Sequence, residues 1–271
     1  MKQTHFLSPW IYGIPVGILL LFSSCWPTSA IYDPYFVDES RQQENIYYVP
    51  SMPNTPLLSK KGDLDFNLAR SSGSKFTGVE LQAAYLPGKH VGLLGSYSYA
   101  SNNDAGQQDM KYNRYELGSG YTTQFSGLLH FETYAGFGNG RISNTHYTGS
   151  SNVSLTHFFL QPAFAISNEK KTIQLGFVSR FSGVNFRVKD TAFNTDRERL
   201  SAAQLVSLYD HPFHVIWEPG IVFRFGWENF LFHTGYSYST DLTAPGLYRS
   251  NGNFSLGFSL RFNTGKTSKT K

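Results

Sequence analysis

The sequence has a single cysteine, Cys25, so the chain cannot form an intramolecular disulfide or a metal site built from cysteines. Charged residues make up only 15% of its 271 residues, whereas soluble globular domains carry about 25%. After the first 30 residues there is no apolar run long enough for a membrane-spanning helix. These absences argue against an ordinary soluble enzyme and leave β-strands as the elements that could cross a membrane.

The formal net charge of +4 does not point to nucleic acid. Lys266, Lys269 and Lys271 lie in a polar tail, and no basic stripe or basic helix is present. We therefore expect no nucleic-acid partner.

Residues 1–30 resemble a secretory leader, with Lys2 before an apolar stretch of about 13 residues. The run that ends at Cys25 resembles a lipobox, which would make residues 1–24 the signal peptide and Cys25 a lipidated first residue. Cleavage after Ala30 is the alternative. No acidic residue follows Cys25 closely, so we expect any acyl chain to lie in the inner leaflet.

Residues 25–62 form the next segment, in which Pro34, Pro50, Pro53 and Pro56 disfavour helices and central strands. We expect an extended periplasmic lead-in that rests against the periplasmic mouth of the following domain. The segment 263–271 is expected to be a polar periplasmic tail.

What the sequence has in abundance is alternation, which runs from residue 63 to residue 262. Aromatic or aliphatic residues occupy every second position of ten runs, an arrangement typical of a transmembrane barrel. The expected strands cover residues 64–70, 76–85, 90–100, 112–123, 128–138, 154–166, 172–181, 213–225, 230–239 and 253–262. The predicted fold is all-β, a transmembrane antiparallel up-and-down β-barrel of about ten strands, with eight as the alternative.

The connections between these strands also alternate in length. Short turns are expected near residues 86–89, 124–127, 168–171 and 226–229, and longer loops near 101–111, 139–152, 182–211 and 240–252. Barrels of the Gram-negative outer membrane keep short turns in the periplasm, so this pattern predicts that both termini are periplasmic. A short amphipathic helix is expected at residues 196–209, as a lid, a partner-binding element or a cover for the barrel mouth.

Isolated charged residues occupy the phase opposite to the apolar positions. Because a charge that faces lipid is costly, we expect these side chains to point inward and to pair in a plugged lumen. The candidate ion-pair residues are Glu80, Arg114, Glu116, Glu132, Arg180, Glu218, Arg224 and Arg261.

Catalytic patterns are weak in this sequence. No serine elbow or histidine spacing for zinc is present, and Asp210-His211 is a solvated loop end rather than one half of a protease site. We predict no catalytic residue, metal or cofactor.

Three sequence elements carry a resemblance to a family. They are the lipobox-like leader, Tyr48-Val49-Pro50, and the stretch from Asn54 to Leu58 with Lys61-Gly62. They resemble uncharacterised outer-membrane β-barrel proteins and lipoproteins of Bacteroidota. The resemblance implies the fold and the outer-membrane location, but no catalytic residues.

The favoured function is a non-enzymatic scaffold or a subunit of an envelope or surface complex. A conduit for small or apolar solutes and an outer-membrane hydrolase are the alternatives. The expected partners are outer-membrane lipid and other envelope proteins, which would bind the 182–211 loop or the 31–62 segment.

Overall fold

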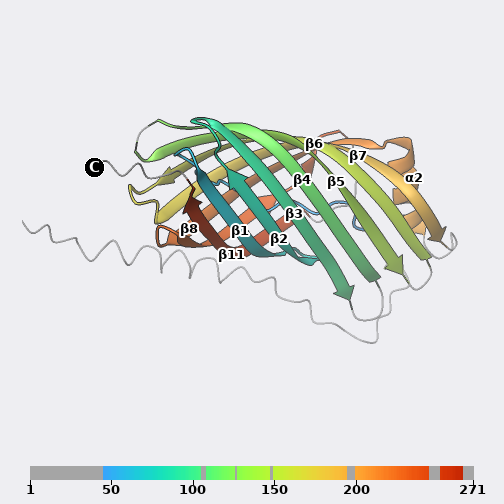
Figure 1. Cartoon of the computed structure of the whole chain (residues 1–271). Coiled ribbons are helices and arrows are strands. Elements are labelled where there is room, and N and C mark those ends of the chain that lie inside the picture. Colours follow the sequence, from blue (N-terminus) through green and yellow to red (C-terminus); the bar gives the residue numbers. More distant parts are fainter. Residues whose placement is uncertain are drawn as a thin grey trace, which may run out of the picture. The chain divides into compact units, whose positions relative to one another are not determined.

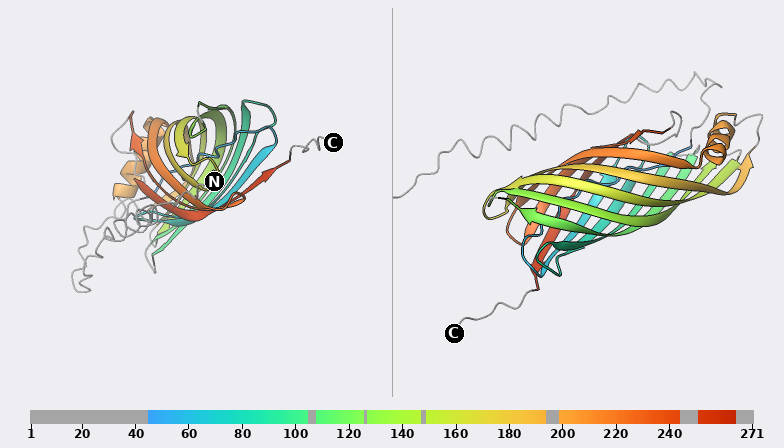
Figure 2. Two further views of the ribbon diagram at one scale, coloured as in Figure 1. Left: turned by 90° about the vertical axis from the view of Figure 1, so that its left-hand side faces the viewer. Right: turned by 90° about the horizontal axis from the view of Figure 1, so that it is seen from above.

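The computed structural model describes residues 45–104, 108–125, 127–146, 149–193, 199–243 and 251–264. These residues form a closed antiparallel barrel in which β1 pairs with both β2 and β11 (Figures 1 and 2). Its strands are β1 (Asp63–Ser72), β2 (Thr77–Tyr85), β3 (Val91–Asp104), β4 (Gln108–Gln124), β5 (Leu129–His146), β6 (Gly149–Ser167), β7 (Ile173–Phe193), β8 (Phe213–Gly226), β9 (Phe230–Tyr238), β10 (Thr240–Asp241) and β11 (Gly252–Asn263).

Ten of these strands enclose the lumen, because β10 is a two-residue strand that pairs only with the start of β8. The neighbours of β9 are β8 and β11, which closes the ring. The predicted transmembrane barrel of ten strands is therefore confirmed, and the alternative of eight is not.

The two ends of the barrel differ. We call the end with the short β2–β3, β4–β5, β6–β7 and β8–β9 connections the turn end, and the opposite end the loop end. Helix α2 (Arg199–Asp210) belongs to the β7–β8 connection and lies at the loop end (Figure 1). The helix expected in this connection is thus present. None of the described helices is long and apolar enough to cross a membrane.

Four strands, β4 to β7, are much longer than the sequence predicts. For example, β5 reaches His146, and β6 begins at Gly149, where we expected a loop over residues 139–152. The expected loop at 101–111 is likewise largely strand, formed by the end of β3 and the start of β4, and the first part of the expected 182–211 loop, up to Phe193, belongs to β7. Figure 1 shows β4, β5, β6 and β7 running further toward α2 than β1 and β2 do.

The prediction ends these strands too early because the chemistry of the alternation reverses along them. In the lower part of each strand, towards the turn end, apolar side chains face outward, and in the upper part, towards the loop end, they face inward. In the lower part of β5, Leu129 and Phe137 are exposed on the outside while Glu132 is buried inside. In the upper part Arg141 is exposed on the outside, and Ile142 is fully buried. The outward apolar pattern stops near residue 138, although the strand and its register continue.

We call the upper parts of β4, β5, β6 and β7 the protruding wall. It begins near residue 109 at the start of β4 and ends near residue 191 at the end of β7, and it leaves out the lower parts of all four strands. On β5 it covers residues 139–146, which at about 3.4 Å per residue and a tilt near 45° rise about 20 Å above the apolar band. Its polar outer face is suited to water rather than to hydrocarbon.

Candidate functional site: a plugged lumen

The lumen is filled by the chain's own N-terminal part. Residues Asn45–Leu58, which we call the plug, are all buried inside the barrel and adopt neither helix nor strand. The backbone N–H of Asn45 donates to Gln204 of α2 at 3.0 Å, and the Leu58 carbonyl accepts from Thr122 at 2.9 Å. The plug therefore runs from the loop end to the turn end, and not along the periplasmic mouth as we expected of residues 45–58.

The plug is long enough to span a membrane. Fourteen residues at about 3.1 Å per extended residue cover roughly 40 Å, more than the hydrocarbon thickness of about 30 Å. Pro50, Pro53 and Pro56 lack a backbone N–H and so reduce the number of donors that must be satisfied. A closed barrel offers no strand edge, so the remaining polar groups of the plug need side-chain partners.

Cationic side chains of the barrel wall donate to the carbonyl oxygens of the plug. The pairs are Arg114 with Val49 at 3.4 Å, Arg224 with Thr55 at 2.7 Å, Arg261 with Pro56 at 3.2 Å and Lys171 with Leu57 at 3.2 Å. Amides donate in the same way, from Asn253 to Pro50 at 2.8 Å and from Gln161 to Asn54 at 3.1 Å. Hydrogen bonds to charged donors are stronger than neutral ones, so these contacts hold the plug firmly.

Carboxylates of the wall accept the backbone N–H groups of the plug. Their pairs are Glu218 with Ser51 at 2.8 Å, Glu80 with Met52 at 3.1 Å and Glu132 with Leu58 at 3.1 Å. These three residues lie on β8, β2 and β5, so the plug is tied to several sides of the barrel.

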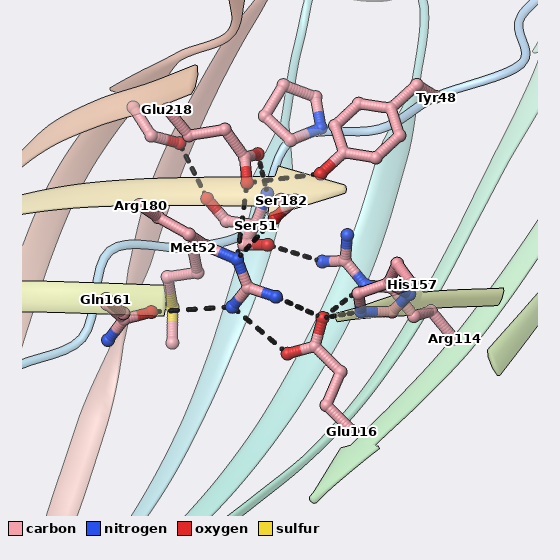
Figure 3. A network of polar contacts seen from close by, with 12 residues as sticks. Tyr48, Ser51, Met52, Arg114, Glu116, His157, Gln161, Arg180, Ser182 and Glu218 are labelled. Carbon is pink, nitrogen blue, oxygen red and sulfur yellow. Dashed lines mark hydrogen bonds and ion pairs between the residues drawn. The ribbon is translucent and has the colours of Figure 1, made fainter. Parts of the chain in front are cut away.

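Glu116 of β4 is the centre of the ionic network in the middle of the lumen (Figure 3). Arg180 of β7 binds both of its oxygens, at 2.6 and 3.1 Å, and Arg114 lies 3.1 Å away. His157 of β6 contributes a contact of 2.8 Å. Two arginines and a histidine thus surround one carboxylate, a geometry that satisfies a charge that is buried out of reach of water.

Glu218 links this network to the plug. Its carboxylate lies 3.4 Å from Arg180 and accepts the hydroxyl of Tyr48 at 3.1 Å in addition to the Ser51 amide (Figure 3). Arg180 also stacks over the ring of Phe159, at 4.1 Å from its centroid. The ionic layer and the plug therefore form one structure, and neither is complete without the other.

A second charged group lies nearer the turn end. Asp65 of β1 pairs with Arg261 at 2.8 Å and is 4.0 Å from Arg224. Arg224 also binds the side chain of Asn54 at 2.5 Å, and Arg261 binds Gln174 at 3.0 Å.

The structure brings together some of the candidate ion-pair residues and not others. Glu116 meets Arg114 and Arg180, and Glu218 meets Arg180. Glu80 and Glu132 instead accept backbone N–H groups of the plug, Glu80 with a second bond from Gln82, and Arg261 pairs with Asp65. The charged residues of the lumen thus serve as ligands of the plug backbone as much as partners of one another.

Glycines of the wall make room for the plug. A Cβ at Gly176 would lie 2.7 Å from the hydroxyl of Thr55, and one at Gly220 would lie 2.8 Å from Pro53. Beside Ser51 and Arg180 a cavity of about 10 Å³ remains, which is space for about one water molecule. At this level the lumen has no room for a solute.

The loop end has an apolar interior. Ile46 and Val49 of the plug pack in one cluster with Ile142, Val153, Leu155, Val184, Phe186, Leu205, Leu208 and Ile216. Leu205 and Leu208 belong to α2, while Val206 and Tyr209 on the same helix are exposed. The helix therefore closes the mouth with one face and presents the other to the exterior.

The turn end is closed by a lysine. Lys171, in the β6–β7 turn, donates to the Leu57 carbonyl and to the Ser59 hydroxyl, the latter at 2.5 Å. Burial, with a further contribution from nearby Arg261, lowers the pKa of Lys171 from 10.5 to about 8.

The Asp210-His211 pair does not form a site in the structure. Both residues are exposed at the end of α2, and the N–H of His211 bonds the carbonyl of Ser207. A different pair, His214 and Asp241, is in contact at 2.8 Å with both side chains buried. Nε2 of His214 has no hydrogen-bond partner in the described part of the chain. No group of three metal-binding side chains is found among the described residues.

The plug is the feature that the sequence interpretation missed. Residues 45–59 contain no charged residue, although Glu44 precedes them and Lys60-Lys61 follows. An uncharged stretch of this length, with proline at every third position, is unusual for a solvated linker. That signal could have placed the segment in the barrel interior. Cys25 lies outside the described residues, as does the rest of the lead-in before Asn45.

No family model and no curated protein matches the chain. Solved structures that resemble it are outer-membrane barrels. The translocator domain of the autotransporter NalP from Neisseria meningitidis is 9% identical, with a TM-score of 0.46, over 76% of this chain and 91% of that one. Ail, the attachment invasion locus protein of Yersinia pestis, is 13% identical with a TM-score of 0.34, over 75% and 100%. The N-terminal barrel of OprF from Pseudomonas aeruginosa is 12% identical with a TM-score of 0.33, over 74% and 98%.

Proposed function

We propose that this protein resides in the outer membrane of a Gram-negative bacterium and acts there as a non-enzymatic scaffold, as a subunit of an envelope or surface complex. The observation that carries the proposal is the plug, which fills the lumen along its whole length and binds its wall. Closed barrels with an apolar outer band are characteristic of such membranes.

The plug speaks against a solute conduit. To open the lumen the plug would have to leave, and Glu218, Glu80 and Glu132 would each lose a hydrogen-bond donor. Hydrogen bonds to charged groups contribute about 1.5–3 kcal/mol each, so the loss of several of them together makes spontaneous opening very rare.

The protruding wall and α2 offer surfaces for a partner. The wall stands above the membrane with Lys111, Arg141, Arg187 and Lys189 exposed on its outer face, and α2 exposes Tyr209 beside it. Aromatic and arginine side chains are enriched at protein interfaces, which makes this the region where an envelope protein would bind. We expected an envelope protein to bind the 182–211 loop. Because the structure forms the upper part of β7 and α2 from these residues, we propose that the partner binds there.

Affinity purification in mild detergent tests the proposal. The wild-type barrel should return with a stoichiometric envelope protein, and Arg187→Glu with Tyr209→Ala should lose that protein without loss of the folded barrel. The matched control is Arg70→Glu, an exposed residue of β1 away from the wall. A barrel that always purifies alone, even after crosslinking in cells, would contradict the scaffold.

Planar-bilayer recording separates the scaffold from the conduit. The wild-type protein should show no channel conductance, and a variant whose residues 46–57 are replaced by a short glycine-serine linker should conduct. Steady ion flow through the wild-type protein would favour the conduit instead.

A further inference from the structure

The described chain leaves the barrel at both of its ends. At the turn end, the N–H of Thr264 donates to the carbonyl of Gly62 at 2.8 Å, beside the start of β1. At the loop end, Asn45 binds Gln204 of α2. Because the plug connects Asn45 to β1 through the lumen, Asn45 and Thr264 lie at opposite mouths of the barrel.

The first plug residues already lie beyond the apolar band. Asn144 of β5 binds both the N–H and the carbonyl of Ile46, at 3.2 and 3.1 Å, and the Tyr47 hydroxyl is 3.4 Å from that of Ser151. Both wall residues belong to the protruding wall, whose outer face is polar. Asn45, the first described residue, therefore lies on the far side of the hydrocarbon layer.

That part of the chain has no way back across the membrane. In the middle of the lumen, beside Ser51 and Arg180, the plug leaves a cavity of only about 10 Å³. Around the barrel, an unpaired polar backbone cannot lie in hydrocarbon. Its composition agrees, because Asp33, Asp38, Glu39, Arg41 and Glu44 are charged whereas the plug has no charge at all.

We propose that the barrel threads its own N-terminal segment to the cell surface. The residues that precede Asn45 in the mature chain lie outside the cell, on the side of the two long connections, β7–β8 and β10–β11, and the residues after Thr264 lie in the periplasm. The proposal rests on the outer-membrane location given above and on the rule that short turns face the periplasm. It replaces the expectation that both termini are periplasmic.

The proposal also changes the expected place of a lipid on Cys25. Asn45 lies twenty positions after Cys25, and a chain of that length can reach about 65–70 Å when extended. This exceeds the roughly 20 Å height of the protruding wall. An acyl chain on Cys25 would thus return to the membrane from outside and enter the outer leaflet, not the inner one.

Epitope tags on whole cells test the threading. One variant carries a tag between Asp38 and Glu39, which survives cleavage after either residue 24 or residue 30, and a matched variant carries the tag after Lys271. An antibody should bind the first variant equally before and after the outer membrane is permeabilised. It should bind the second only after permeabilisation. Adding Cys25→Ser to the first tagged variant should leave its surface signal intact, because the plug alone holds the segment outside.

The contrary results are distinct. Tags that are both accessible only after permeabilisation would overturn the threading, as would loss of the surface signal in Cys25→Ser with the barrel still folded. A C-terminal tag on the surface with an N-terminal tag inside would overturn the assignment of the loop end to the exterior. Absence of the protein from outer-membrane fractions would instead remove the proposed function on which the inference rests.

Discussion

The lower and upper parts of the long strands have the same alternating backbone, but the polar and apolar side chains face opposite sides in the two parts. In the lower part of β5 and β6, Phe137 and Phe158 face outward while Glu132 and His157 face inward. In the protruding wall, polar side chains such as Arg141 face outward, and apolar ones face inward. The strands keep their direction between the two parts, and β5 and β6 keep their register, although β6 and β7 shift by one residue at a bulge near Asn152. What changes is the surroundings, from lipid to water.

The plug takes part in both regions and changes with them. Beside the apolar inner face of the wall it presents Ile46 and Val49, and beside the charged inner face of the lower barrel it presents backbone groups and Ser51. Each part of the plug thus matches the layer that surrounds it. The same segment completes a hydrophobic core above the membrane and a hydrogen-bonded core within it.

The largest expected effect is the loss of a charge from the inner layer of the lower barrel. Arg180→Met removes the two contacts with Glu116 and leaves that carboxylate partly unpaired, so we expect a loss of about 3–5 kcal/mol of stability. Urea unfolding in detergent measures it. Adding Glu116→Gln to the same chain should restore part of the loss, and an unchanged or additive loss would refute the coupling.

The upper part should respond to apolar truncation instead. Ile142→Ala opens a hole beside the plug and should cost about 2–4 kcal/mol, with faster proteolysis of the wall. Its outward neighbour Ser143 provides the control, because Ser143→Ala removes no packed atoms of comparable size. Equal effects of the two changes would mean that the wall has no core.

Substitutions at outward-facing positions should show where the lipid-covered part of the barrel ends. Phe137→Arg places a charge in the apolar band and should lower the stability of the folded barrel by about 2–4 kcal/mol. The loss should be at the lower end of this range if residue 137 lies near the membrane interface. Two residues further along the same face, Asn139→Arg should be nearly neutral. Folding yields in vesicles compare the two variants, and a similar penalty at both positions would place the wall inside the membrane.

The smallest effect concerns the latch at the turn end. The pKa of Lys171 is lower in the folded protein, about 8, than its ordinary value of 10.5, so the unfolded chain binds more protons between these values. Stability should therefore rise with pH across the window from 8 to 10.5, by on the order of 1–2 kcal/mol after screening. Lys171→Met should lack this part of the pH dependence in thermal melts. Identical pH profiles of the two proteins would show that Lys171 does not contribute to closing the turn end.

The sequence predicts the lower barrel well because one physical rule governs it. Phe258 and Leu260 can only face lipid, and Glu116 and Arg180 can only face the lumen, so the strands and their inward residues follow from alternation. That rule fails above the membrane, where the charged Arg141 faces outward and the apolar Ile142 faces inward. It also fails for the plug, whose position depends on side chains from β2, β5 and β8 that are far from it in sequence.

A disulfide between plug and wall tests the central claim, that the plug lies inside the barrel. Thr55 lies against Gly176 of β7, with side-chain atoms 2.7 and 2.9 Å from the Cβ that a residue there would carry. The Thr55 Cβ is one bond from those atoms, so the two Cβ atoms lie no more than about 4 Å apart, inside the upper limit of roughly 4.5 Å for a disulfide. Oxidised membranes that contain Thr55→Cys with Gly176→Cys should yield a reducible intramolecular bond, which shifts the mobility of the unfolded chain. Thr55→Cys with Phe177→Cys, which faces outward, should not. Free thiols in both pairs would contradict a plugged lumen.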